Sequence, residues 1–508
     1  MTTLLTLDAG TSGLKCSLFS PDGTLLGAFV SDYPVSYPRE GWAEQDANDF
    51  VRAAVESVNA LGESCDLSGV CAIGLSGTMN GCVPLDENGV PLYPNMIHLD
   101  TRATREVDFL MNAMGLHTYY GITGNRPDVH YGLPKLMWLK EHENDVYRCA
   151  KTCVNTKDIL YGFLTGIRGR SDASDASLFG AYNVNTRMWD DEVLRAAGID
   201  REKLPEIRPS TDVSGLLCPE AARVLGLKSG IPVAIGAGDG ACTTHGSGVF
   251  SENGAYLTVG SSAWICGLSR SPLPDAEARA FNYADMDERF TNVCGTVACA
   301  AAAFDYMMKN VFDVTDSEGN IDFSEAEALC AESVPGAHGL FFLPTLMGER
   351  CPWWDASARG MLAGLTLTHT RADMARAAYE GIAQALHNCG DVLFENGMEF
   401  RDLVLSGGGV KSGVWPQMFA DVFNLPARVH ANPREATSLG AAIAAGVGVG
   451  LFSSFEEASK MVKTGASFSP DPERAKAYRA HTRVYRALYG QMKDAMHAIS
   501  DYQASLRP

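Results

Sequence analysis

The 508-residue chain lacks the motifs of several common protein classes. Its 14 cysteines include no CxxC pair and its 11 histidines no HExxH motif, so no zinc site is predicted. No GxxxxGK[ST] motif occurs, and no GxGxxG follows the first predicted strand, which argues against a P-loop protein and a dinucleotide enzyme. Lys and Arg number only 41 against 61 Asp and Glu, and a net charge of -20 disfavours nucleic acid as a partner.

Long hydrophobic runs and processing signals are also missing. The longest small-apolar stretch, LGAAIAAGVGVGLF (Leu439–Phe452), is too short and too rich in glycine to cross a bilayer. A strand pattern begins directly after Met1, so we expect no secretory leader. Scattered cysteines in a long chain are typical of reduced thiols. We therefore expect a cytoplasmic protein with no membrane partner.

What the chain does contain is a regular alternation of strand-like and helix-like patterns, which indicates an α/β fold. The segment LDAGTSGLKCSL (Leu7–Leu18) has a weak echo in LTVGSSAWICGL (Leu257–Leu268). Either two Gly-Ser hairpins agree by chance, or the fold is duplicated, with hairpins facing each other across a cleft. The second reading divides the chain into domains 1–248 and 249–508, and the lack of a flexible linker suggests that they share an interface.

Three glycine-rich turns follow predicted strands, at Gly10, Gly260 and Gly407–Gly409. Backbone N–H groups in such turns can converge on phosphate oxygens, because no Cβ atom blocks the approach. Asp8 ends the first strand beside one of these turns. A carboxylate tolerates phosphate there only with a cation between them, which predicts Mg²⁺. The alternative is an Asp that forms a turn with its own backbone.

Asp239 stands in GAGDGA (Gly236–Ala241), where glycines on both sides leave space around its carboxylate. A carboxylate at a strand end can take the proton of a hydroxyl group that attacks phosphorus. The alternative is an N-cap of the following helix. A cap gains nothing from two flanking glycines, which favours the functional interpretation.

These motifs resemble those of the FGGY carbohydrate kinase family, and the resemblance covers nearly the full length. In the partial match YGLPKLMWL, Gly132 stands where the family usually has Pro, Ser or Thr. The motifs that carry the resemblance are DAGTSGLK (Asp8–Lys15), YGLPKLMWL (Tyr131–Leu139), GAGDGA, VGSSAW (Val259–Trp264), FLPTLMGERCPWWD (Phe342–Asp355), the C-terminal signature GMLAGLTLTHTRADMARAAYEG (Gly360–Gly381) and LSGGGVKSGVW (Leu405–Trp415).

The resemblance implies two RNase-H-like (actin/hexokinase-like ATPase) domains with a central cleft. It implies that ATP with Mg²⁺ binds mainly to the C-terminal lobe and a sugar to the N-terminal lobe. Asp239 is then the catalytic base, in contact with the sugar, and Asp8 helps to place the metal. The residues implied to hold the nucleotide are Gly10, Thr11, Ser12, Gly260, Ser261, Gly408, Gly409 and Gly413.

Within the family the chain is most similar to the xylulose kinases. These usually carry Met-His-Gly where this chain has Met79-Asn80-Gly81, and an asparagine can still donate to and accept from sugar hydroxyls. Downstream, HLDTR (His98–Arg102) keeps Asp100 and Arg102 of the xylulose kinase segment but loses its aromatic residue. We expect Met79, Asn80, Asp100 and Arg102 to contact the sugar. For Asp100, the alternative is a surface ion pair with Arg102 or Arg105.

The predicted function is phosphorylation by ATP of a primary hydroxyl of a small sugar, a ketopentose such as D-xylulose. A second possibility is a family kinase for ribulose, gluconate, glycerol or a signalling furanose. A third, of another class, is a non-catalytic actin-like ATPase or sugar sensor, which has no need of Asp239. A homodimer is common in the family, although no residue here identifies an interface.

Overall fold

The computed structural model describes residues 1–506, and the chain forms two compact units. The domains predicted from sequence divide the chain at one point, whereas each unit here combines several segments. Unit 1 comprises Met1–Phe250, Leu268–Asn292 and Glu435–Lys463, and unit 2 comprises Ser251–Gly267, Val293–Arg434 and the chain from Thr464 onward.

The central sheet of unit 1 has the strand order β13-β14-β5-β1-β2-β3, with β15 also paired to β5. Strands β1, β2 and β3 form an antiparallel meander, whereas β1, β14 and β15 run parallel to β5. The strands are β1 (Thr3–Ala9), β2 (Gly13–Phe19), β3 (Leu25–Asp32), β5 (Val70–Gly77), β13 (Gly215–Leu216), β14 (Pro232–Val233) and β15 (Ala237–Gly238).

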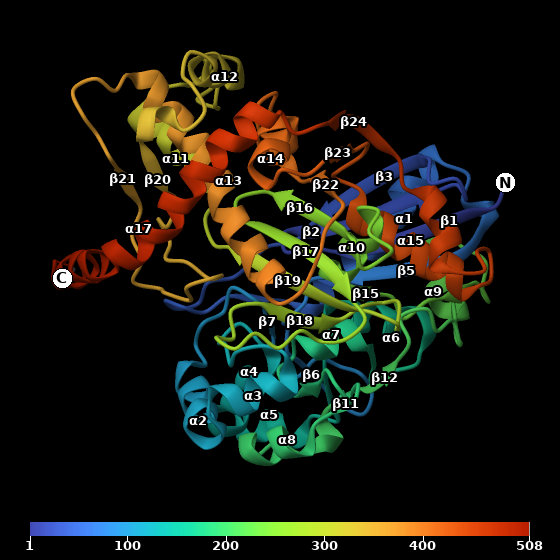
Figure 1. Cartoon of the computed structure of the whole chain (residues 1–508). Helices are drawn as coiled ribbons and strands as arrows, with labels where there is room; N and C mark the ends of the chain where they lie inside the picture. Colours follow the sequence, from blue (N-terminus) through green and yellow to red (C-terminus); the bar gives the residue numbers. More distant parts are fainter. Residues whose placement is uncertain (507–508) are drawn as a thin grey trace. The chain divides into compact units, whose positions relative to one another are not determined.

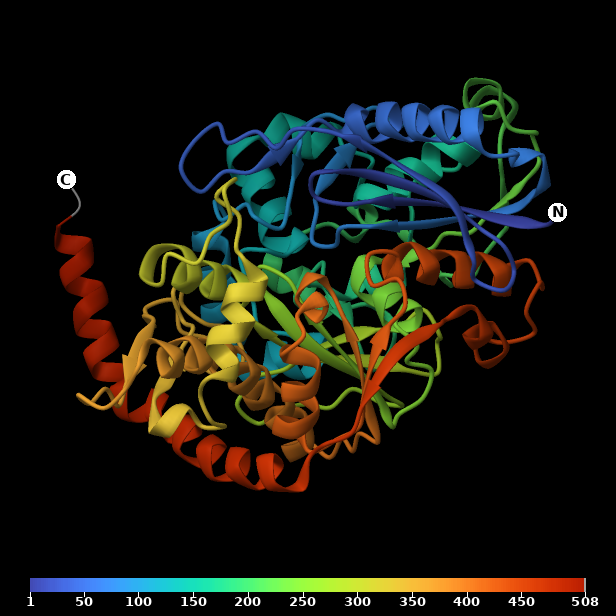
Figure 2. The ribbon, with the colours of Figure 1, turned by 90° about the horizontal axis from the view of Figure 1, so that it is seen from above.

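Helices cover both faces of this sheet. Helix α1 packs on β2 and β3, and α15 packs on β1 and β5; Figure 2 shows these two helices on opposite faces. Helices α10 and α15 touch along their backbones, since a Cβ atom on Gly440 would lie 1.9 Å from the Cys242 carbonyl oxygen. These helices are α1 (Ala47–Ser64), α6 (Thr156–Thr165), α7 (Ala173–Ser177), α9 (Pro219–Leu225), α10 (Asp239–Gly246), α15 (Ala436–Gly448) and α16 (Phe455–Ala458).

A second apolar core in unit 1 lies among helices that sit together in Figure 1. It is built from aromatic and aliphatic side chains of these helices, among them Leu136 and Trp138. The helices are α2 (Thr104–Met114), α3 (Leu116–Thr123), α4 (Gly132–His142), α5 (Asn144–Cys149) and α8 (Asp191–Ala197). The short strands of unit 1 are β4 (Glu44–Gln45), β6 (Val83–Leu85), β7 (Asn95–Met96), β8 (Thr152–Val154), β9 (Arg170–Asp172), β10 (Tyr182–Asn183), β11 (Met188–Trp189), β12 (Glu206–Arg208) and β18 (Phe281–Ala284).

Unit 2 has a sheet with the order β19-β17-β16-β22-β23-β24. Its strands are β16 (Gly254–Val259), β17 (Ala263–Ser269), β19 (Thr291–Val297), β22 (Asp402–Ser406), β23 (Ala427–His430) and β24 (Thr464–Phe468), and a separate hairpin joins β20 (Phe341–Leu343) to β21 (Met361–Ala363). Its helices are α11 (Ala301–Tyr306), α12 (Phe323–Ala331), α13 (Arg371–Glu395), α14 (Trp415–Phe423) and α17 (Pro472–Ser505).

The two sheets repeat one pattern. In unit 1, β1 pairs antiparallel with β2 and parallel with β5; in unit 2, β16 pairs antiparallel with β17 and parallel with β22. The echo between the two Gly-Ser hairpins therefore reflects a duplicated fold, the second of the two readings considered from sequence. Across residues 1–506, no helix has both the length and the apolar character needed to cross a membrane.

Candidate active site

The candidate site of unit 1 lies where three parallel strands end. Asp8 of β1 is in register with Ser76 of β5, and Ser76 is in register with Ala237 of β15. Asp239 begins α10 directly after β15, so both predicted acids lie at the carboxyl edge of one sheet. Ligands of open α/β sheets bind at this edge, because the turns there have room to diverge.

Asp8 is half-buried and has neighbours of both charges. Burial raises its pKa to about 6, while the Lys15 ammonium and the neighbouring hydroxyls of Ser76 and Ser438 oppose the rise. Glu435 adds to the rise, and it also pairs with Lys15 at 3.3 Å. Such a carboxylate retains capacity to accept a cation.

Asp239 is also half-buried, and its pKa is raised to about 7, first by burial and then by the charge of Asp8. The backbone on either side of Asp239 is closely packed, which favours glycine at positions 238 and 240. A Cβ atom on Gly238 would lie 2.5 Å from Met79 Cγ, and one on Gly240 would lie 3.0 Å from the Tyr283 hydroxyl oxygen. Gly238, one residue earlier, holds the N-cap position of α10, which leaves the capping alternative for Asp239 unsupported. A pKa near 7 suits a general base.

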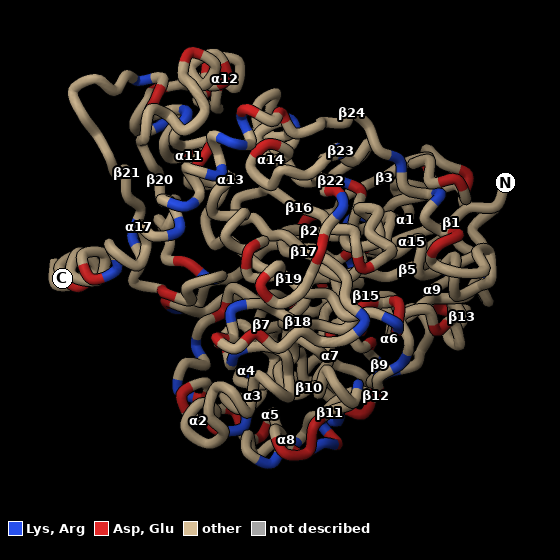
Figure 3. The backbone as a smooth tube through the Cα atoms, viewed as in Figure 1, with Lys and Arg blue, Asp and Glu red and all other residues tan. Residues whose placement is uncertain are grey.

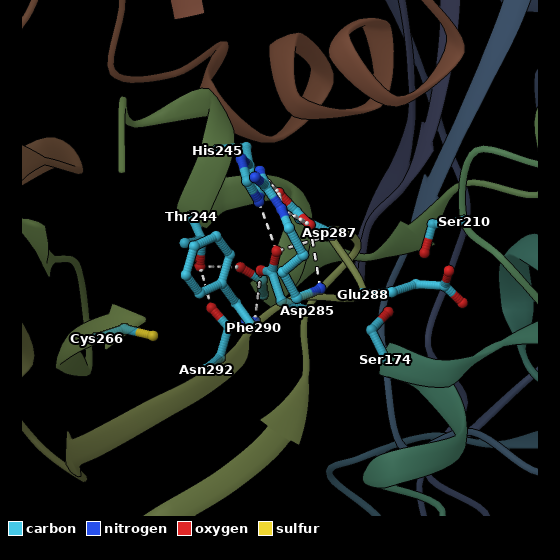
Figure 4. Close-up of polar contacts among 12 residues, drawn as sticks. Ser174, Ser210, Thr244, His245, Cys266, Asp285, Asp287, Glu288, Phe290 and Asn292 are labelled. Carbon is cyan, nitrogen blue, oxygen red and sulfur yellow. Dashed lines mark hydrogen bonds and ion pairs between the residues drawn. The ribbon is translucent and has the colours of Figure 1, made fainter. Parts of the chain in front are cut away.

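A buried polar network fixes helix α10, which begins with Asp239. His245 Nε2 lies 2.5 Å from Asp285 Oδ1, and Asn292 Nδ2 donates to Asp285 Oδ2 at 2.8 Å. The Thr244 hydroxyl donates to Asn292 Oδ1 at 2.7 Å. Figure 4 shows these four side chains converging. The network ties the helix to the loop after β18 and so limits movement of the base.

A second network holds the residue before the base. The Gly238 N–H donates to Ser174 Oγ at 2.9 Å, and Ser174 Oγ donates to Asp172 Oδ2 at 2.6 Å. Ser210 donates to the same carboxylate oxygen of Asp172 at 2.9 Å without touching Gly238. Asp172 Oδ1 lies 3.0 Å from the ammonium of Lys157, a side chain with no exposed surface.

The same lysine supports the turn Met79–Gly81 after β5, whose residues Met79 and Asn80 are predicted to contact the sugar; we call it the sugar-contact turn. Lys157 also pairs with Asp175 at 3.0 Å, and Asn155 Nδ2 donates to that aspartate at 3.0 Å. Asn155 Oδ1 in turn accepts the Gly81 N–H at 3.0 Å. The turn after β5 and the turn before Asp239 are therefore both bonded to one buried charge cluster.

Asn80 itself has a left-handed backbone, with φ of 71°. Its carbonyl oxygen accepts a hydrogen bond of 2.8 Å from Lys135 Nζ, and this buried lysine also holds the carbonyls of Ile97 and His130. Burial lowers the pKa of Lys135 to about 7. Asn80 Oδ1 has no hydrogen-bond partner among residues 1–506, which leaves it as an acceptor for a ligand hydroxyl.

Asp100 forms an ion pair with Arg102, one of the two partners considered from sequence, but the pair is buried and does not lie on the surface as that alternative assumed. Asp100 has no exposed surface; its Oδ2 lies 2.5 Å from Arg102 Nη2 and accepts the Ala43 N–H at 2.7 Å. Arg102 also pairs with Glu44 at 2.7 Å and stacks on Trp42, 3.6 Å from the ring centroid. Their proposed sugar contact stays a prediction; the observed contacts hold the loop next to the sugar-contact turn.

The first predicted phosphate turn, Gly10–Ser12, closes with a 2.9 Å hydrogen bond from Gly10 N to the Gly13 carbonyl. The Tyr33 hydroxyl donates to the Gly10 carbonyl at 2.6 Å and Gln45 Nε2 to the Thr11 carbonyl at 2.7 Å. Both of these side-chain bonds end on carbonyl oxygens of the turn, so neither occupies a backbone N–H group. The turn continues from Asp8, so it lies at the same sheet edge.

The remaining predicted residues belong to unit 2. Thr258 of β16 is in register with Ser406 of β22, so Gly260–Ser261 and Gly407–Gly409 follow neighbouring strand ends. Gly407 has φ of 86°, and the Cβ position of Gly408 meets no atom within 4 Å. Gly413 lies further along, where its N–H donates to Glu327 Oε1 at 2.7 Å.

The structure thus assembles Asp8, Asp239, Met79 and Asn80 at one edge of unit 1, with two glycine turns together in unit 2. Sequence reasoning missed the side chains that support the edge. They are Lys135, Lys157, Ser174, Asp172, Asn155 and His245. Only Lys135 stood in a recognised motif. The others carry no local signal, because the contacts that join them to the site link residues distant in sequence: Ser174 with Gly238, Lys157 with Asp172, Asn155 with Gly81 and His245 with Asp285.

Comparison with known proteins agrees with this architecture. Residues 3–246 match the N-terminal domain of the FGGY family of carbohydrate kinases, and residues 255–449 match its C-terminal domain. The chain is 30% identical to the xylulose kinase of Bacillus subtilis over 98% of each protein. It is 28% identical to the gluconokinase of the same organism, over 99% of this chain and 98% of that protein.

A solved structure of the ligand-bound xylulose kinase from Lactobacillus acidophilus superposes with a TM-score of 0.91. It is 27% identical to this chain, and the match covers 98% of this chain and 100% of that one. The duplicated sheets, the two family domains and the full-length relatives all lead to the same assignment: the chain belongs to the FGGY family of carbohydrate kinases and is a sugar kinase.

Proposed function

We propose that the chain transfers the terminal phosphoryl group of ATP to a primary hydroxyl of a ketopentose such as D-xylulose. Kinases of this family use ATP. The observation that carries the proposal is Asp239, a base with a pKa of about 7 at the carboxyl edge of the unit 1 sheet, beside the turn that contains Asn80.

Asp239 acts as the general base in this proposal. Its carboxylate accepts the proton of the sugar hydroxyl as that oxygen attacks phosphorus. Gly238 and Gly240 let Met79 and Tyr283 lie close to the backbone on either side of the base, and the hydrogen bonds of Gly238 with Ser174 and of His245 with Asp285 hold this backbone in place. Because the base is held in place, less conformational entropy is lost in reaching a reactive geometry.

Asp8 would hold Mg²⁺. Its carboxylate oxygens are the ligand type that Mg²⁺ prefers. Asp8 raises the pKa of Asp239, and a cation beside these neighbouring carboxylates relieves that repulsion. When bound, Mg²⁺ supplies charge neutralisation on the phosphate oxygens. The turns at Gly10–Ser12, Gly260–Ser261 and Gly408–Gly409 offer backbone N–H groups for phosphates, and Gly413 is proposed to line the adenine pocket.

The acceptor is proposed to be a neutral sugar because nearby cations are already committed. Lys135 Nζ donates to three carbonyl oxygens, and the Arg102 guanidinium pairs with Asp100 and Glu44. Neither offers a free charge to the carboxylate of a sugar acid. Asn80 offers an amide, which suits hydroxyl groups.

Gluconate is the second candidate, because gluconokinases match the chain as extensively as xylulose kinases do. The test is ADP release by purified protein with ketoses, aldoses, polyols and sugar acids, and NMR of the product to locate the phosphate. We expect the highest kcat/KM with D-xylulose. A higher value with gluconate would overturn the ketopentose assignment, and no release with any sugar would overturn the proposed reaction.

A further inference from the structure

Glu106, four residues after Arg102, has an unusual environment. It is the third residue of α2, and only 4% of its surface is exposed. Neither of its carboxylate oxygens has a hydrogen-bond partner in the part of the chain that the structure describes. Burying an unpaired carboxylate is costly. Helix capping does not account for the burial, because α2 has no side-chain cap hydrogen bond and neither Glu106 oxygen accepts a backbone N–H of the described residues.

Two possible metal ligands lie next to this carboxylate. Glu141 and His142 are the last two residues of α4, which packs against α2. One ligand atom from each of Glu106, Glu141 and His142 lies within 4.8 Å of the other two. We propose that these three side chains form a zinc-binding site that joins α2 to α4.

The contacts of His142 orient its imidazole ring for metal binding. His142 Nδ1 lies 3.1 Å from the Trp138 carbonyl oxygen, and the imidazole stacks on the Trp138 ring at a centroid distance of 4.8 Å. Donation from Nδ1 to the carbonyl leaves the lone pair of Nε2 for a metal. Histidines that bind metals usually make such a second hydrogen bond, which fixes the ring and its tautomer.

Charge favours a dication at this position. Glu106 and Glu141 place two carboxylates close together, and neither oxygen of the buried Glu106 carboxylate has a hydrogen-bond partner among the described residues. Among the described residues, Glu141 forms only a long ion pair, 3.9 Å from exposed Arg105. Figure 3 shows residues of both signs along α2. A bound cation therefore compensates two carboxylates that the protein alone neutralises poorly.

The donor set selects the metal. One imidazole and two carboxylates suit zinc, whereas Mg²⁺ and Ca²⁺ favour oxygen ligands alone. Bonds of about 2.0–2.2 Å need ligand atoms closer together than those seen here. Glu141, with 57% of its side chain exposed, is free to close that gap. Water supplies the fourth ligand, as in other zinc sites with three protein ligands.

The ligands of this site come from two helices, which is why the sequence shows no zinc motif. Glu106 and Glu141 belong to different helices, so their spacing matches none of the local patterns. Binding would clamp α2 to α4, the helix that carries Lys135 and Trp138. We therefore expect zinc to stabilise unit 1 without taking part in phosphoryl transfer.

Titration calorimetry of the full chain, freed of metal by chelation and dialysis, tests the proposal with ZnCl₂ at pH 7.5. We expect one zinc per chain at this site, a higher Tm, and a tetrahedral absorption spectrum with Co²⁺. Glu106→Gln and His142→Gln should each weaken binding at least tenfold, whereas Glu143→Gln, at the same helix end, should leave it unchanged.

Glu141→Gln keeps the test decisive if a change at buried Glu106 prevents folding, because Glu141 is exposed. Its expected effect is likewise at least tenfold. The proposal is overturned if wild-type protein binds no zinc, or if zinc binds equally well to the Glu141 and His142 variants. A Co²⁺ spectrum unchanged by His142→Gln would also overturn it.

Discussion

Replacing Asp239 with asparagine should stop catalysis and stabilise the protein at the same time. The folded chain raises the pKa of Asp239 to about 7, against roughly 3.9 in an unfolded chain. Folded protein therefore keeps a proton that unfolded protein releases as the pH rises from about 4 to 7. Stability contributed by this group is complete below the unfolded pKa and is lost as pH rises to the folded pKa.

The two pKa values set the size of the effect. At about 1.4 kcal/mol per pH unit, their difference corresponds to roughly 4 kcal/mol above pH 7 and roughly 1.5 kcal/mol at pH 5. Solvent reaches the half-buried carboxylate, so the full figure is an upper limit. We expect Asp239→Asn to raise the free energy of unfolding by about 2–4 kcal/mol at pH 8, with a clearly smaller gain at pH 5.

Urea unfolding followed by circular dichroism at both pH values measures this gain, and ADP release measures activity. We expect kcat to fall by about 10²–10⁴-fold with ATP affinity near normal. Asp22→Asn is the control, because Asp22 is exposed and its pKa is lowered rather than raised. A variant less stable than wild type at pH 8, or equally stabilised at both pH values, would refute the reasoning.

The pH profile offers a second prediction: kcat/KM should fall tenfold per pH unit below about pH 7, because Asp239 becomes protonated there. Asp8→Asn should move this acidic limb of the profile to lower pH, since the charge of Asp8 helps to raise the pKa of Asp239. An unmoved limb contradicts the electrostatic coupling. Ser174→Ala should lower kcat at least fivefold and Ser210→Ala much less, because only Ser174 bonds Gly238; equal effects in steady-state assays reject the positioning role. Arg102→Met should cost about 3–5 kcal/mol in urea unfolding, because it leaves buried carboxylates unpaired; a loss below 1 kcal/mol shows that the pair contributes little.

The sequence was sufficient to predict the elements that position the two acids. As expected from the sequence, Asp8 lies near the end of β1 beside a glycine turn, and Asp239 directly follows β15. Parallel pairing then brought Asp8 and Asp239 to one edge. The segment from Glu435 was different, because it clusters with unit 1 although it follows most of unit 2 in sequence. A division at one point could not place Glu435 or Ser438 beside Asp8.

The supporting side chains were beyond prediction for a related reason. Lys157 contacts Asp158 as a neighbour, but Asp172 and Asp175 reach it only after α6, β9 and α7 have packed together. In the sequence, a buried lysine and its aspartates cannot be told from ordinary surface charges, because only the folded structure shows that they are buried. Glu106 gives the same lesson, since its missing partners become visible only once its burial is known.

The Lys157 cluster links the proposed sugar-contact turn to Asp239, the proposed base. Gly81 is bonded to it through Asn155, and Gly238 through Ser174 and Asp172. Desolvating one ammonium with three carboxylates is expensive, so a purely stabilising core would be built more cheaply from apolar side chains. Ionic hydrogen bonds have direction, which apolar contacts lack. The cluster is therefore best understood as fixing the distance between the sugar-contact turn and Asp239, the quantity on which proton transfer depends most steeply.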